Sequence, residues 1–206
     1  VVSDDAAERK RARMINVNGD WCHPSKGFTI DALTLGRHLC RIPRFGGALS
    51  TFYTVGQHSL FVAAMMRVDG KTPREQLAGL LHDRGEFPRG DIPTDWKTDA
   101  DRETESLVER LCLKALGLEE FTLAERIAVK PFDREACVVE GNIVAPMCLE
   151  RMPEKYVNPE LVAKRIDTFR YFYQEDPADA FMRNWTHKYK DSFSMMFAAT
   201  FDKLVR

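Results

Sequence analysis

The chain has 206 residues, of which 44% are hydrophobic and 30% are charged, a composition typical of a globular protein with a sizeable core. Its 30 Lys and Arg residues nearly balance its 31 Asp and Glu residues, which gives a formal net charge of −1. This balance argues against a general nucleic-acid-binding surface, so any phosphate chemistry would depend on a local basic cluster.

The sequence predicts a cytoplasmic protein with no membrane or nucleic-acid partner. No apolar run approaches the roughly 18 residues that a membrane-spanning helix requires. The charged N-terminal sequence lacks the apolar segment of a secretory signal. The five cysteines are an odd number and include no C-x-x-C pair, so neither a disulfide framework nor a cysteine zinc site is expected.

Hydrophobic spacing predicts helices along most of the chain. In residues 54–68, apolar side chains from Phe61 to Val68 recur at the i, i+3, i+4, i+7 spacing of one helix face. Thr72 and Glu75 form a capping box with proline at the first helical position, which predicts the start of a second helix.

The pattern stays helical further along the chain. A polar opening at residues 99–106 leads into an apolar stretch that Gly117 closes. A second capping box, Thr122 to Glu125, begins a helix, and we expect a separate helix at residues 132–144. Asparagine–proline and aspartate–proline pairs predict the starts of two late helices, at residues 158–159 and 176–177.

We therefore predict an all-α fold with one domain. Only the segment MINVNG, residues 14–19, resembles a short strand. The expected domain covers residues 1–206, with a core at about 30–173, an irregular N-terminal extension at 1–29 and an extra C-terminal helix at 174–206.

The stretch GLLHDRGEFPRGDIP, residues 79–93, carries the densest group of reactive side chains. His82 and Asp83 directly follow the leucines of a helix that is otherwise apolar. Such polar groups are costly to bury unless something satisfies them, and a divalent cation would do so. Adjacent helical residues point about 100° apart, so both reach one ion only where the helix ends.

Two more potential ligands lie on faces that should turn inward. His58 shares the face of Phe61, and Asp133 lies one turn before Ala136. With His82 and Asp83 they form a set of two nitrogens and two oxygens. This set suits one Mn, Fe, Co, Zn or Mg ion without choosing among them. Each residue alone fits a hydrogen-bonded core or turn position, but the coincidence of the four favours a metal site.

The order H…HD…D in a helical chain resembles the HD-domain phosphohydrolases. HDRGEFPRGDIPTDWK, residues 82–97, is similar to a segment of the branch that includes bacterial 5′-deoxynucleotidases, to which phage dATP triphosphohydrolases are related. The resemblance covers roughly residues 30–150. Two departures are Arg84, where we expect a small residue, and Phe45, where the branch often has tryptophan.

The resemblance implies a role for each matching residue. The implied metal ligands are His58, His82, Asp83 and Asp133. Glu86 and Asp91 match an acidic pair that handles protons on the attacking water and the leaving oxygen. The remaining matches are basic positions that meet phosphate and one aromatic that packs on a base or sugar: Arg44, Lys97, Lys130 and Phe45. Glu140 shares the helical face of Asp133, where it would support a ligand histidine or simply be surface charge.

The function expected from this resemblance is metal-dependent hydrolysis of small nucleotides, above all deoxynucleoside 5′-monophosphates. A dNTP triphosphohydrolase of the dATP type is the nearest alternative. A catalytically silent, nucleotide-binding or regulatory module on the same scaffold is an alternative of another class. A homo-oligomer, dimer or larger, is expected, for which the aromatic C-terminal helix would offer an interface.

Overall fold

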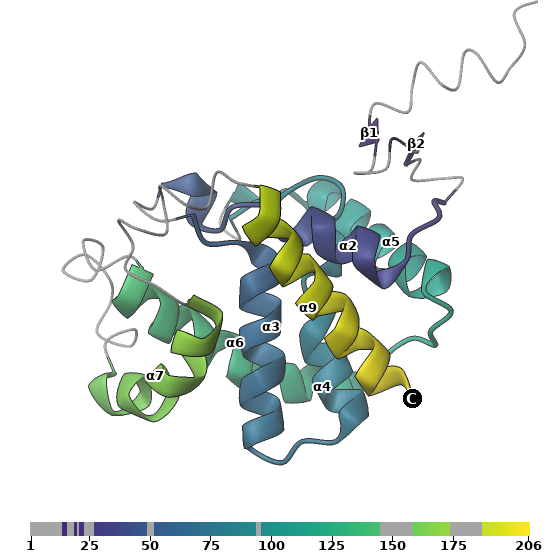
Figure 1. Ribbon diagram of the computed structural model, residues 1–206. Coiled ribbons are helices and arrows are strands. Elements are labelled where there is room, and N and C mark those ends of the chain that lie inside the picture. The colour runs from purple at the N-terminus through teal and green to yellow at the C-terminus, as the bar shows by residue number, and fades with distance from the viewer. Residues whose placement is uncertain are drawn as a thin grey trace, which may run out of the picture.

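The computed structural model describes residues 14–15, 19, 21–22, 27–48, 52–93, 96–144, 158–173 and 187–206 (Figure 1). The helices are α2 Ala32–Leu39, α3 Val55–Val68, α4 Pro73–Leu80, α5 Asp99–Ala115, α6 Leu123–Val144, α7 Pro159–Tyr173 and α9 His187–Val205. Two single 3-10 turns are η1 Phe45–Gly47 and η2 Arg84–Glu86. These elements confirm the predicted all-α class. The expected strand is half of a minimal antiparallel hairpin, β1 Met14–Ile15 with β2 Trp21–Cys22.

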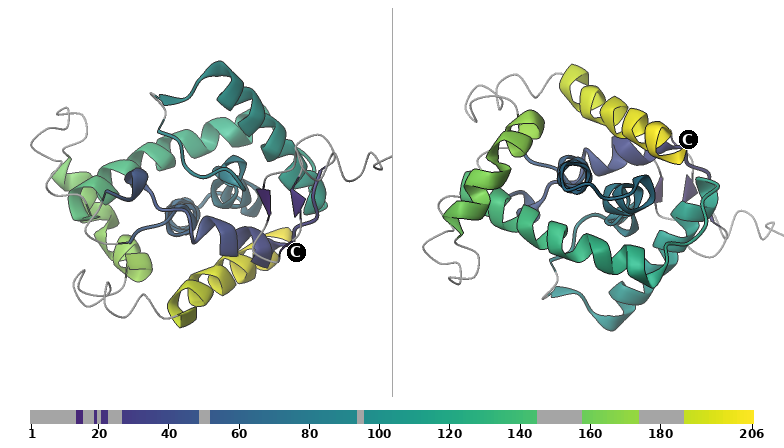
Figure 2. Two further views of the ribbon diagram at one scale, coloured as in Figure 1. Left: turned by 90° about the horizontal axis from the view of Figure 1, so that it is seen from above. Right: turned by 90° about the horizontal axis from the view of Figure 1, so that it is seen from below.

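Helices α3 and α4 pack side by side at the centre of the fold (Figures 1 and 2). Seen end-on, they are flanked by α6 on one side and α9 on the other (Figure 2). Helix α2 packs on α9, α7 packs on α3 and α6, and α5 packs on η2. Because α3 is covered on several sides, its residues from Val55 to Met66 are all buried.

Side-chain caps fix the starts of several helices as predicted. Thr72 and Glu75 form a reciprocal capping box at α4, and the Asn158 side chain accepts a hydrogen bond from the Leu161 amide at α7. The side chain of Thr54 caps α3 in the same way, which fixes the first turn of the helix that carries His58. The aspartate–proline pair at 176–177 lies outside the described residues.

Helix α6 corrects one prediction. Two helices were expected at residues 123–130 and 132–144, whereas the structure has one helix, Leu123–Val144, with Pro131 inside it. Proline removes one backbone donor from a helix interior. Val129 and Phe132, on either side of it, are both buried, so the packing of both halves on the core outweighs the lost hydrogen bond. Asp133 therefore lies within a long, continuous helix.

The aromatic face of α9 belongs to the core. Phe193, Phe197 and Phe201 recur every four residues and are at most 7% exposed. A Cβ atom on Gly36 of α2 would lie 3.1 Å from Phe197 side-chain atoms, so glycine permits the close approach of these two helices. The predicted interface role of this helix therefore does not rest on these three aromatics. Among the described residues, no helix is long and apolar enough to cross a membrane.

The end of α3 differs in one detail from the predicted apolar face. Val68 is 62% exposed, because α3 ends at this residue and Asp69 caps it. Asp69 instead accepts a bidentate ion pair from Arg165 of α7, at 2.6 and 2.7 Å. The same guanidinium binds Glu135 of α6 at 2.8 Å. This buried arginine therefore ties α3, α6 and α7 together.

Phe197→Ala should destabilise the fold by about 3–5 kcal/mol, because it removes a fully buried ring between α9 and α2. Chemical denaturation of the two proteins measures the difference. Met195→Ala on the same helix is the matched control, since Met195 is 57% exposed and should change stability by only about 0.5 kcal/mol or less. Equal losses in both variants would contradict the packing described for α9.

Candidate metal centre

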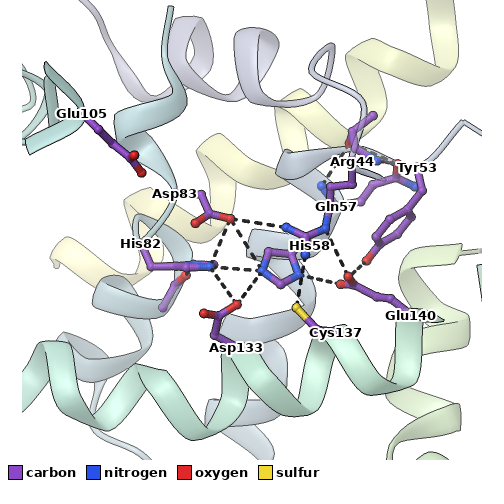
Figure 3. Close-up of polar contacts among 12 residues, drawn as sticks. Arg44, Tyr53, Gln57, His58, His82, Asp83, Glu105, Asp133, Cys137 and Glu140 are labelled. Carbon is purple, nitrogen blue, oxygen red and sulfur yellow. Dashed lines mark hydrogen bonds and ion pairs between the residues drawn. The ribbon is translucent and has the colours of Figure 1, made fainter. Parts of the chain in front are cut away.

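Four side chains from three segments meet beside the first turn of α3 (Figure 3). His58 comes from α3 and Asp133 from α6. His82 and Asp83 lie in the turn between α4, which ends at Leu80, and η2. This is the helix-end position that lets adjacent residues turn toward one point.

Three of these residues form a compact group that could hold a metal ion: His58, His82 and Asp133. The two Nε2 atoms lie 3.1 Å apart, and Asp133 Oδ1 lies 3.3 Å from His58 Nε2 and 3.7 Å from His82 Nε2. Ligand atoms about 2.0–2.2 Å from one ion are about 3–4 Å from one another. The spacing of the group therefore fits a single ion.

Asp83, the fourth predicted ligand, lies next to this group rather than within it. Its Oδ2 is 3.2 Å from His82 Nε2 and 3.6 Å from His58 Nε2. Figure 3 places Asp83 and Asp133 on opposite sides of the two imidazoles. The two carboxylates therefore approach the same pair of nitrogens from opposite directions.

Hydrogen bonds on the far side of each imidazole determine which nitrogen faces the cluster. His82 Nδ1 lies 2.7 Å from the carbonyl oxygen of Gly79, which only accepts, so this Nδ1 carries a proton. His58 Nδ1 lies 2.6 Å from Glu140 Oε1. Although Glu140 is buried, His58 and Arg44 hold its pKa below the ordinary value, so Glu140 is an ionised acceptor.

With a proton on each Nδ1, two neutral imidazoles would face each other through the lone pairs of their Nε2 atoms. Two carboxylates flank these atoms, so the arrangement is repulsive unless an Nε2 proton or a metal ion lies among the four groups. Burial lowers the pKa of His82, but Asp83 and Asp133 outweigh burial and hold that pKa well above its ordinary value. Protons and a metal ion thus compete for the same Nε2 atoms beside the two carboxylates, and metal binding would release the protons.

Glu140 binds His58 on the side of the imidazole that faces away from the cluster. Its side chain is fully buried, and it accepts hydrogen bonds from His58 Nδ1 and from the Tyr53 hydroxyl, the latter at 3.0 Å. Arg44 Nε lies 3.2 Å from Glu140 Oε2. A carboxylate that binds the outer nitrogen of a ligand histidine fixes its tautomer and raises its basicity. The structure thus favours the supporting role of Glu140 over surface charge.

Glu140→Gln should weaken metal binding by roughly 10–100-fold, because the variant keeps the shape but loses the charge that orients His58. Competition with a chelator of known affinity measures this change. Glu103→Gln, an exposed carboxylate on α5, is the matched control and should leave affinity unchanged. A Glu140→Gln protein with unchanged metal affinity would contradict the supporting role.

Arg44 lies at the centre, but its guanidinium already has partners. It lies 3.6 Å from Asp83 and 3.2 Å from Glu140, and it donates to Cys137 Sγ at 3.4 Å. These contacts join a predicted metal ligand to the buried carboxylate behind His58. Its predicted contact with substrate phosphate stays a prediction, and that contact would compete with Asp83 for the same guanidinium.

Phe45 follows Arg44 in a sharply turned loop. Its φ is +56°, and Gly46 and Gly47 after it also have positive φ. The Arg44 guanidinium lies 5.5 Å from the Phe45 ring centroid, and the ring packs partly against the core. The loop backbone thus holds Phe45 beside Arg44, while its predicted contact with a base or sugar stays untested.

Glu86 and Asp91 have the environments of proton-handling groups. Glu86 is 7% exposed, and burial, together with the charges of Asp83 and Asp91, raises its pKa to about 9. Its Oε2 has no hydrogen-bond partner among the described residues. Burial also raises the pKa of Asp91, which is half-buried. Raised carboxyl pKa values of this kind are common at catalytic positions.

The two predicted phosphate-binding lysines differ in their surroundings. Lys97 is paired with Glu105, with Nζ 2.7 Å from Oε2, and its charge acts on Glu86 and Asp91. Lys130 is exposed on α6, one turn before Asp133, and no hydrogen bond or ion pair joins it to the described part of the cluster. Of the two lysines, only Lys97 is placed where its charge acts on the acidic pair.

Sequence reasoning missed Tyr53. It lies in an irregular loop, so no helical periodicity marked it as inward-facing, yet it is 1% exposed and donates to Glu140. Comparison with family models finds no match for this chain, and comparison with curated proteins finds none either.

Proposed function

We propose that the chain is a metal-dependent phosphohydrolase of the HD type. Its proposed substrates are small nucleotides, in particular deoxynucleoside 5′-monophosphates. The observation that carries the proposal is the convergence of His58, His82 and Asp133 on one point, with Asp83 beside them. Nothing in a helical fold requires four such groups to meet, and a divalent cation would satisfy all four of them at once.

The proposed ligands are His58, His82, Asp83 and Asp133. The ion would be a single Mn, Fe, Co, Zn or Mg, which the mixed nitrogen and oxygen set accepts. A divalent ion there would lower the pKa of a water molecule and offset negative charge on phosphoryl oxygens.

The acidic pair completes the proposed chemistry. Burial and the charges of Asp83 and Asp91 raise the pKa of Glu86 in the metal-free protein, and a carboxyl group that keeps its proton suits a donor to the leaving oxygen. Asp91 has a less buried carboxyl and suits an acceptor for the proton of the attacking water. Hydrolysis then needs positive charge for the phosphate, and Arg44 and Lys97 are the candidates.

The acidic pair also favours this proposal over a silent binding module. A module that only binds nucleotide has no use for a buried Glu86 whose Oε2 lacks a partner, because such a group costs stability. A dNTP triphosphohydrolase would use the same centre but needs positive charge for three phosphates. The number of basic groups free to meet the substrate decides between the two enzymes.

A substrate screen tests the proposal. Purified protein is freed of metal and then supplied with Mn, Co, Fe, Zn or Mg in turn, with nucleoside mono-, di- and triphosphates as substrates. We expect phosphate release from deoxynucleoside monophosphates with the highest kcat/KM. Release of intact triphosphate from a dNTP at a higher kcat/KM would establish the triphosphohydrolase instead, and binding without hydrolysis would establish the silent module.

A further inference from the structure

A polar cavity whose lining contains none of the candidate metal ligands lies beside η2. It has a volume of about 90 Å³, several times what one water molecule needs. Residues from η2, α5, α6 and the loop between the two helices line it: Arg84, Ser106, Glu109, Arg110, Leu113, Glu120, Phe121 and Arg126. Arginines from three segments therefore line one small volume.

Arg84 forms the buried wall of this cavity. The residue is 7% exposed, and its NH1 donates to the Leu81 carbonyl at 2.7 Å while its Nε donates to the Glu109 carbonyl at 3.1 Å. Its NH2 lies 3.5 Å from Glu109 Oε2, and its guanidinium lies 5.4 Å from the Phe121 ring centroid. These contacts hold the guanidinium in place before any ligand arrives.

The other two arginines, Arg110 and Arg126, have no acidic partner among the described residues. Arg110 and Arg126 are exposed, and neither makes a hydrogen bond or ion pair with the described residues. The lining holds three arginines against two glutamates, a net charge of +1, and one of these glutamates, Glu109, already faces Arg84. The cavity therefore has two uncommitted cations beside a rigid, buried one.

These features select the chemical class of a ligand. Guanidinium groups present paired N–H donors that match the oxygens of phosphate. A planar, singly charged carboxylate would be satisfied by one guanidinium. A tetrahedral, doubly charged oxyanion can accept from groups that approach from several directions. The Ser106 hydroxyl adds a neutral donor at the same rim.

We propose that this cavity is a phosphate-binding site, separate from the metal centre, in which Arg84, Arg110 and Arg126 bind a phosphate group. The group is either inorganic phosphate or the terminal phosphate of a nucleotide. The proposal does not rest on the proposed function, because none of the three arginines is a candidate metal ligand or proton donor. Arg84 directly follows Asp83, so a bound phosphate would hold the segment that also carries Glu86.

The test is a binding titration of full-length protein in the presence of a chelator, which prevents phosphate from binding through a metal ion. Inorganic phosphate, dAMP and dATP are titrated separately and followed by calorimetry. Arg110→Ala and Arg126→Ala are the test variants, since both side chains are exposed and neither change threatens folding. We expect each to weaken binding of at least one of these ligands roughly tenfold or more.

Lys114→Ala is the matched control. Lys114 is exposed on α5, one turn after Arg110, and does not line the cavity, so its loss removes one positive charge from the same helix. This control should bind as the unchanged protein does. Inorganic phosphate binding alone identifies a site for the free ion, while tighter binding of dATP that depends on the same arginines identifies a nucleotide phosphate. No binding, or binding that Arg110→Ala and Arg126→Ala leave unchanged, overturns the proposal.

Discussion

His82→Ala should abolish retention of the metal ion and not merely slow turnover. The imidazole supplies the Nε2 atom that lies 3.1 Å from His58 Nε2 and 3.2 Å from Asp83 Oδ2. Without it, the remaining groups contain one nitrogen and two carboxylates on opposite sides, and the compact group of three no longer exists. Loss of one ligand from such a compact site would remove both a bond and the geometry that selects the ion.

Metal content after gel filtration measures this result directly. We expect about one equivalent in the unchanged protein and none in His82→Ala or Asp133→Ala. Asp167→Ala is the matched control, because Asp167 is an almost fully exposed carboxylate on α7. A folded His82→Ala protein that still holds one equivalent of metal would place the ion elsewhere.

Glu86→Gln should lower the rate of nucleotide hydrolysis by roughly 10²–10⁴-fold while metal stays bound. The amide has nearly the same shape as the carboxyl group but neither donates nor accepts a proton in the reaction. The effect should fall on kcat, because the proposed metal ligands and the proposed phosphate-binding side chains are unchanged. Steady-state kinetics, together with metal analysis of the same sample, measures both quantities. Glu103→Gln, on the exposed face of α5, should retain the full rate.

The pH dependence of stability of Glu86→Gln is a second test, and the same measurements show whether the variant is folded when its rate is measured. The folded-state pKa of Glu86 is raised to about 9, mainly by burial, so the folded state binds more protons than the unfolded state between the ordinary pKa and pH 9. Stability from this group is therefore present at low pH and is lost as the pH rises through 9. Metal-free Glu86→Gln should lose less stability than the unchanged protein between pH 6 and 9. A variant with full activity would eliminate Glu86 as the proton-handling group.

The positions of the metal-binding candidates could be predicted because local patterns determine them. His58 lies on an apolar helix face, Asp133 precedes Ala136 by one turn, and His82 and Asp83 follow an apolar helix. Side chains on the inward faces of packed helices share one small interior, so these four groups lie close together. The capping box at Thr72 was equally local and is present.

Contacts between distant segments could not be predicted in the same way. Tyr53 meets Glu140 across 87 residues, and Arg44 meets Cys137 across 93. No spacing in the sequence encodes such pairs. The direction of Arg84 was also open, since an arginine beside Asp83 could reach toward either the substrate or solvent. Its contacts with Phe121 and Glu109 place the Arg84 side chain in the wall of a cavity that is separate from the metal centre.

Helix α6 shows a further limit of local reasoning. Separate helices were expected before and after Pro131, yet burial of Val129 and Phe132 on either side keeps one helix. At this position, tertiary packing overrides the low helix propensity of proline, as tertiary context often does. The continuity of α6 fixes the relative positions of Asp133 and Glu140, two turns apart on the same side, and so links the candidate metal ligand to its supporting carboxylate.

Metal titration of chelated protein, with hydrolysis of a deoxynucleoside monophosphate as the readout, tests the central claim most directly. The account predicts that chelated protein is inactive, and that activity rises with added divalent metal and levels off at about one equivalent. The same titration of His82→Ala should stay flat. Hydrolysis that survives chelation, or that His82→Ala retains, would contradict a reaction that depends on metal at this centre.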